Sequence, residues 1–299
     1  MARRTPAPTN TLLAPRASAL TAVLAAALAG EPEAVHQARV ASRRLREVLP
    51  VLTAGHERAG RGLRKDVRRV TRAFGAVREL DVAIGHFDEA VAAAEMSAAA
   101  RATTRRVLQA QRAAALRQAR ATLTRARLQR LQTRLDELAV AIATSTTTDA
   151  AAVKATMATR VARRARGVRQ AVTGTGVVYM PERLHNVRIA VKRLRYALEA
   201  GQEARGVRAT AQLTQLKAIQ DLLGRAHDLH VLAERIHEVE IGVVQRSRAT
   251  ARDLAALVRA LDGECRALHA AFMSRRHGLL MLSAALVTRA SAPRARSVA

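Results

Sequence analysis

The stretch HNVRIAVKRLR, residues 185–195, sets a histidine and four basic residues among small and aliphatic ones. HQARVASRRLR, residues 36–46, has nearly the same pattern. The two stretches are offset by 149 residues, close to half of the 299-residue chain, so we expect an internal repeat. At this offset His36, Arg39, Ala41, Arg44, Leu45 and Arg46 match His185, Arg188, Ala190, Arg193, Leu194 and Arg195, and Arg43 matches Lys192.

The same offset extends beyond this motif, since Gly75 matches Gly224 and Leu80 matches Leu229. Apolar residues recur with helical spacing along most of the chain, and the alternation typical of strands is missing. The fold class is therefore predicted as all-α, with two helical bundles related by a pseudo-twofold axis. The predicted segments are a flexible tail (1–15), an N-terminal helical half (16–146), a C-terminal helical half (147–290) and a second tail (291–299).

Local signals set the expected boundaries of several helices. Leucines at three- and four-residue spacing predict one long bundle helix over residues 97–143. The polar segment 144–149 predicts a break, with Asp149 capping the next helix. Residues 174–183 form the other predicted loop, which ends with Pro181 in the first turn of a helix.

The apolar segment before Gly30 has two interpretations. Basic residues precede it, and Ala27-Leu28-Ala29 resembles a signal-peptidase site. The spacing of Leu20, Val23, Leu24 and Leu28 instead favours a helix of the core, which is the interpretation we prefer. No run of 18 apolar residues occurs elsewhere, so we expect no membrane partner.

The composition points to a negatively charged partner. Lysine and arginine number 51 against 24 acidic residues, which gives a net charge of +27. So many positive charges repel one another within the fold unless a polyanion neutralises them. Arginine predominates over lysine, which suits bidentate phosphate contacts and is also what a GC-rich genome produces. Aromatic residues are only 2%, which disfavours stacking on RNA or single-stranded DNA. Cys265 alone makes neither a disulfide nor a thiolate cluster, as suits a reducing cytosol.

Each copy of the motif is predicted to carry a basic stripe beside its apolar face. At 100° per residue, His36, Arg39, Arg43 and Arg46 share one side of a helix, and their matches in the second copy do the same. A basic stripe is commonly just a solvated face. We expect these stripes to lack acidic partners, so that phosphate oxygens would relieve the repulsion between like charges. A second basic row follows on the next helix: Arg61, Lys65, Arg68 and Arg72.

The motif histidines are not expected to bind metal or to catalyse a reaction. Their neighbours are arginines rather than further metal ligands. His227, Asp228 and His230 resemble a metal site more closely, but this pattern on one helix is weak. Neither stripe supplies a nucleophile or a carboxylate pair. We therefore predict no metal, no cofactor and no enzymatic activity.

The two signature helices closely resemble those of the CHAD family of histidine-containing α-helical domains. The matching stretches are EPEAVHQARVASRRLREVLPVL (31–52) and PERLHNVRIAVKRLRYALEA (181–200). FGAVRELDVAI (74–84) and LKAIQDLLGRAHDLHVL (216–232) resemble the motifs that follow in that family. The resemblance covers roughly residues 17–290. It implies two bundles around a basic central cavity, binding of inorganic polyphosphate, and a cytoplasmic location on bacterial polyphosphate granules.

Together the stripes and the resemblance give the expected polyphosphate-binding residues. His227 departs from the family, which usually has asparagine there. Duplex DNA, bound without sequence preference, is the alternative partner, and a polyphosphate-processing enzyme is the less favoured third class.

The histidines predict that affinity for polyphosphate rises as pH falls through about 6.5. The expected residues are His36, Arg39, Arg43, Arg44, Arg46, Lys65, Arg68, His185, Arg188, Lys192, Arg193, Arg195 and Lys217.

Overall fold

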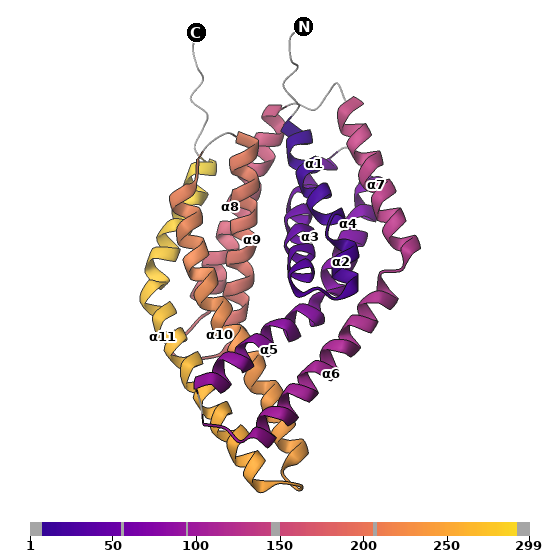
Figure 1. Cartoon of the computed structure of the whole chain (residues 1–299). Coiled ribbons are helices and arrows are strands. Elements are labelled where there is room, and N and C mark those ends of the chain that lie inside the picture. The colour runs from indigo at the N-terminus through magenta and orange to yellow at the C-terminus, as the bar shows by residue number, and fades with distance from the viewer. Residues whose placement is uncertain (1–7, 55–56, 94, 145–149, 206–207, 292–299) are drawn as a thin grey trace.

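The computed structural model describes residues 8–54, 57–93, 95–144, 150–205 and 208–291, and within these ranges the fold is all-helical, without a strand (Figure 1). The all-α part of the predicted fold class is confirmed. The helices are α1 (Pro8–Thr21), α2 (Leu24–Ala29), α3 (Pro32–Leu52), α4 (Glu57–Ala73), α5 (Gly75–Ala93), α6 (Ala98–Thr122), α7 (Arg125–Thr144), α8 (Ala150–Thr173), α9 (Pro181–Arg205), α10 (Thr210–Val243) and α11 (Arg248–Ser291).

The helices form two groups that meet along α3 and α9. In Figure 1, α1 to α4 and α7 lie on one side and α8 to α11 on the other. The pair α5 and α6 leaves the first group and packs against the far ends of α10 and α11. Contacts of α3 with α8 and α9 join the groups in the middle, which brings the two motif helices together.

The apolar face of α3 and that of α9 as far as Leu198 are used in separate cores, which leaves the basic stripes outside these cores. Leu45 and Leu49 of α3 are fully buried among α1, α4 and α7. Val187 and Leu194 of α9 are fully buried among α8, α10 and α11. A third core joins α5 and α6 to the ends of α10 and α11, with Phe87 near its centre. The apolar periodicity therefore orients both basic stripes.

Both motif helices begin at a proline, as the sequence predicts. Pro32 opens α3 behind Glu31, and Glu33 stands in its first turn. Pro181 opens α9, again with an acidic residue, Glu182, in the first turn. Proline's fixed φ suits the first helical turn, and the carboxylates favour the positive end of the helix dipole.

The prediction of one helix across 97–143 is wrong at Leu123. The backbone of Leu123 (φ −106°, ψ 63°) leaves the helical region and ends α6, and α7 begins at Arg125. Leu123 itself is buried, 3% exposed, in the core of the first group. The bend lets α7 pack on α1 and α4, whereas α11 runs unbroken from Arg248 to Ser291.

The predicted N-terminal tail is also partly wrong, because α1 starts at Pro8 and buries Leu12 and Leu13. By length and composition alone, Leu12–Ala29 is apolar enough to cross a membrane. Here it forms α1 and α2 against α3, with Leu20 and Ala27 fully buried, in keeping with a core helix.

Several predicted boundaries fall outside the described residues. These are residues 1–7, the break at 145–149 with Asp149, and the C-terminal tail beyond Ser291. Within the described residues, α11 extends one residue into the predicted tail.

Candidate functional site

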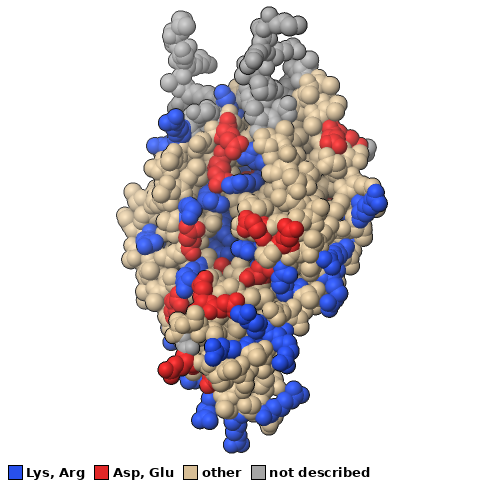
Figure 2. Space-filling model, in the orientation of Figure 1, with Lys and Arg blue, Asp and Glu red and all other residues tan. Residues whose placement is uncertain are grey.

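A hollow between the two helix groups gathers most of the basic stripe residues. Figure 2 shows lysines and arginines inside this hollow, with carboxylates along its edges. One part of it, here called the main pocket, has a volume of about 1070 Å³. Among its described lining residues 13 are lysine or arginine, and Glu47 is the only acid. The bases are Arg43, Arg46, Arg61, Arg64, Lys65, Arg68, Arg69, Arg72, Arg160, Arg164, Arg188, Lys192 and Arg193.

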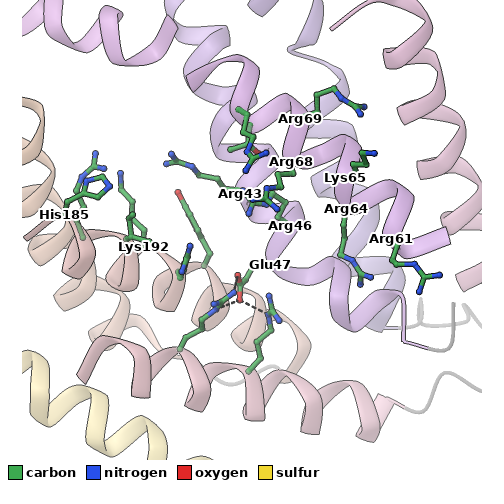
Figure 3. Close-up of a pocket in the computed structure, with 18 of the residues that line it drawn as sticks. Arg43, Arg46, Glu47, Arg61, Arg64, Lys65, Arg68, Arg69, His185 and Lys192 are labelled. Carbon is green, nitrogen blue, oxygen red and sulfur yellow. Dashed lines mark hydrogen bonds and ion pairs between the residues drawn. The ribbon is translucent and has the colours of Figure 1, made fainter. Parts of the chain in front are cut away.

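The two motifs line opposite walls of the main pocket. In Figure 3, His185 and Lys192 of α9 lie across from Arg43 and Arg46 of α3. The basic row of α4, which includes Lys65, extends the wall on the side of α3. Residues of both stripes therefore line one pocket.

A smaller pocket of about 390 Å³, here called the His36 pocket, adjoins the main pocket. Both pockets share Arg43, Arg188 and Lys192, which therefore stand between them. Unlike the main pocket, the His36 pocket mixes charges. Its lining includes His36, Arg39, Arg78, Arg225 and His227 together with Glu79, Asp221 and Asp228.

The basic residues of the two motifs lie close enough for their positive charges to lower one another's pKa. Burial, followed by Arg188 and Arg43, lowers the pKa of Lys192 to about 6. Burial and then Arg43 lower the pKa of Arg39 to about 10. The pKa of Arg46 is lowered by burial, by Arg68 and by Arg193 across the pocket. A buried group of like charges is unfavourable until an anion neutralises it.

Repeat-matched arginines lie against repeat-matched glycines. Arg39 Nη1 donates to the carbonyl oxygen of Thr71 at 2.8 Å, and a Cβ on Gly75 would come within 3.3 Å of the same nitrogen. In the second group, a Cβ on Gly224 would lie 3.9 Å from Arg188 Nε. A side chain at Gly75 would require the Arg39 guanidinium to shift by a few tenths of an ångström.

The histidines near the stripes are less basic than free histidine. His185 Nδ1 lies 3.1 Å from His227 Nδ1. Burial, followed by Arg188 and His185, lowers the pKa of His227 to about 3. Burial and neighbouring arginines also lower the pKa of His36 and of His185. The pH dependence predicted near 6.5 is therefore displaced, since both motif histidines titrate lower in the unliganded protein.

Helix α8 contributes two arginines that the sequence analysis missed. Glu47 accepts hydrogen bonds from Arg160 Nε at 2.7 Å and from Arg164 at 3.0 and 3.1 Å. Figure 3 draws these bonds at Glu47. The side chains of Arg160 and Glu47 are only 9% and 7% exposed. Arg160 and Arg164 are four residues apart on α8, and this spacing in the sequence indicates that both lie on one helical face.

The expectation that the stripes lack acidic partners is wrong. Arg188 Nη2 lies 3.4 Å from Asp228 of α10. Glu199 contacts Arg195 at 3.5 Å, one turn away on α9, and Arg44 at 3.3 Å from α3. These carboxylates neutralise the bases on the flanks of the stripes.

Three predicted site residues do not line either pocket. Arg44 and Arg195 are held by Glu199, and Arg195 also stacks over the Tyr196 ring at 5.1 Å. Lys217 is 65% exposed and bonds to Asp221 at 2.6 Å. The other ten predicted residues do line one or both pockets.

The metal-like cluster at residues 227–230 does not assemble. Among the described residues, no three His, Cys, Asp or Glu side chains come together closely enough to hold a metal ion. His227 faces His185, and Asp228 faces Arg188.

The family model described as "CHAD domain" matches residues 11–237. The chain belongs to the CHAD domain family. No curated protein sequence matches it. Among solved structures, the CHAD domain from the plant Ricinus communis is 21% identical, with a TM-score of 0.62 over 96% of this chain and 92% of that one. PptA from Streptomyces chartreusis is 17% identical, with a TM-score of 0.62 over 95% of this chain and 98% of that one. These similarities establish a CHAD fold.

Proposed function

We propose that this CHAD protein binds inorganic polyphosphate in the main pocket. The observation that carries the proposal is the lining itself, in which 13 bases meet a single acid. Phosphate oxygens accept charge-assisted hydrogen bonds from arginine and lysine. They would also counter the two effects that depress the pKa of Lys192, which are burial and then repulsion by Arg188 and Arg43.

The two motif copies act in this proposal as two halves of one site. They form pseudo-twofold-related bundles around a central basic cavity. The equivalent placement of Arg39 beside Gly75 and of Arg188 beside Gly224 supports this relation. So does the position of Arg43 and Lys192, which match in the repeat and both line the two pockets.

A flexible polymer suits the pocket better than duplex DNA does. Arg188 and Lys192 are recessed, and the side chain of Arg188 is only 14% exposed. Duplex DNA is stiff over about 50 nm, so it would meet only exposed residues at the rim, such as Arg46 and Lys65. The net charge of +27 is the observation that keeps duplex DNA as the second candidate.

We further propose that the protein binds polyphosphate without cleaving or extending it, and that it resides on polyphosphate granules in the cytoplasm. Glu47, the one acid among the described residues of the main pocket, is bound by two arginines, which leaves it poorly suited to act as a general base. The proposed location is tested with a fluorescent fusion of the protein. Its signal should coincide with stained granules, and a diffuse signal in granule-containing cells would contradict the location.

The binding proposal is tested by titrating the purified protein with long-chain polyphosphate and, separately, with orthophosphate. Saturable binding of the polymer, much tighter than that of orthophosphate, is expected. Equal affinity for the two would contradict it. Gel analysis of the polymer after incubation with ATP or ADP should show unchanged chain length, and shortening or extension would contradict the non-enzymatic role.

A further inference from the structure

A third pocket, here called the α8 groove, leads away from the main pocket between α8 and α9. Its volume is about 370 Å³. It shares Arg164, Ile189 and Arg193 with the main pocket, so the two are continuous along this wall. Arg163 directly precedes Arg164 on α8, and Gln170 lies further along the same helix.

The α8 groove offers hydrogen-bond donors and no carboxylate among its described lining residues. Arg163, Arg164 and Arg193 supply guanidinium groups, and the side chains of Gln170 and Asn186 supply amides. The His36 pocket, at the other side of the main pocket, contains three acids. A polyanion that extends beyond the main pocket therefore meets arginines without carboxylates along α8, whereas in the His36 pocket the bases stand beside three acids.

Gly167 keeps the middle of the groove open. It lies inside α8, where glycine is unfavourable because of its conformational entropy. A Cβ added at Gly167 would meet nothing within 4 Å, so packing does not require glycine here. Since Gly167 lines the groove, a larger side chain there would occupy groove volume, and this position offers a way to block the groove.

We infer that the α8 groove is an additional polyphosphate subsite, reached by long chains that already occupy the main pocket. This inference rests on the proposed function. The subsite belongs to one half only, because Arg163 and Arg164 correspond to Ala14 and Pro15 at the 149-residue offset. Affinity therefore grows with chain length through contacts that the repeated motif does not supply.

The test compares Arg163→Ala with Arg166→Ala, using long-chain polyphosphate and tripolyphosphate as ligands. Arg166 is an exposed arginine of the same helix that lines none of the three pockets. Arg163→Ala should reduce the slope of log affinity against log salt for the long chain by about 1, as the loss of one phosphate contact does for nucleic acids. Arg166→Ala should leave that slope unchanged, and neither substitution should alter tripolyphosphate binding.

A second pair of variants places a charge in the groove without removing an arginine. Gly167→Asp should weaken binding of the long chain several-fold more than its neutral counterpart Gly167→Asn, and it should spare tripolyphosphate.

The inference would be overturned if Arg163→Ala and Arg166→Ala had the same salt slope with the long chain. It would also be overturned if Arg163→Ala lost as much affinity for tripolyphosphate as for the long chain. These results are distinct from failure of the proposed function. If Arg43→Ala weakens both ligands while the groove variants bind normally, only the subsite is refuted. If the wild-type protein binds neither ligand, polyphosphate binding itself is refuted, and the subsite with it.

Discussion

The ring nitrogens His185 Nδ1 and His227 Nδ1 lie 3.1 Å apart, close enough for one to donate a hydrogen bond to the other. One of the two must then be an acceptor, so the pair does not carry a proton on both facing nitrogens. Arg188 disfavours protonation of both rings, because it lowers both pKa values after burial does. The pair, with His227 where the family usually has asparagine, is therefore a neutral element beside the cations.

Polyphosphate binding should take up protons. Lys192, with a pKa of about 6, is mostly neutral at pH 7.5 in the unliganded protein, and neighbouring phosphates favour its charged form. Affinity should therefore rise as pH falls from about 8 toward 6, and the contribution of Lys192 should level off below its unliganded pKa. Calorimetry in two buffers of different ionisation enthalpy measures the uptake. Uptake unchanged in Lys192→Met would contradict this assignment.

Lys192 should also lower the stability of the unliganded fold. Its pKa in the folded state is below the ordinary 10.5, so the unfolded chain binds more protons between pH 6 and 10.5. Stability from this group therefore rises with pH across that window. Lys192→Met should raise the free energy of unfolding by about 0.5–2 kcal/mol near pH 6–7, with the gain shrinking toward pH 10. A melting temperature of Lys192→Met below that of wild type at pH 7 would contradict a destabilising effect of Lys192.

Arg43→Ala and Arg44→Ala make a matched pair of neighbouring substitutions. Arg43 lines both pockets, whereas Arg44 is 46% exposed and contacts Glu199. Loss of a charge-assisted bond costs about 1.5–3 kcal/mol, so Arg43→Ala should weaken polyphosphate binding at least tenfold. Arg44→Ala should have little effect.

Lys192→Ala should likewise weaken binding, because Lys192 faces Arg43 from the second motif. Titration measures all three variants and the Arg43→Ala/Lys192→Ala double mutant, with melting temperature as the folding control. Normal binding by Lys192→Ala beside a defective Arg43→Ala would refute one site shared by both motifs.

Glu47→Gln should destabilise the unliganded protein without weakening polyphosphate binding. The substitution removes the carboxylate that pairs with Arg160 and Arg164, and breaking a buried pair costs about 3–5 kcal/mol. The exposed pair of Glu264 and Arg225 supplies a control, since Glu264→Gln should cost less than about 1 kcal/mol. Denaturant unfolding measures both. Polyphosphate should raise the melting temperature of Glu47→Gln more than that of wild type, because it replaces the missing negative charge; an equal or smaller shift counts against this role.

Local sequence patterns predicted the motif helices well but not their long-range partners. The stripes of α3 and α9 follow from helical periodicity, which also buries Leu45 and Leu194. Glu47 meets Arg160 across 113 residues, and no local rule indicates such a pair.

Repeat matching also misplaced a residue, since Lys217 matches Arg68 but is exposed and bound to Asp221. The bend at Leu123 escaped prediction because neither glycine nor proline marks it.

The most direct test is competition between long-chain polyphosphate and duplex DNA for the protein at physiological salt. A recessed pocket that requires a flexible phosphate chain predicts that polyphosphate displaces DNA completely, while excess duplex displaces little polyphosphate. The logarithm of the polyphosphate binding constant should also fall linearly with the logarithm of the salt concentration, and binding should depend on Arg43 and Lys192. Two results together would contradict the pocket as the polyphosphate site. Duplex DNA would displace polyphosphate at an equal concentration of phosphate groups, and Arg43→Ala would change the affinity for neither ligand.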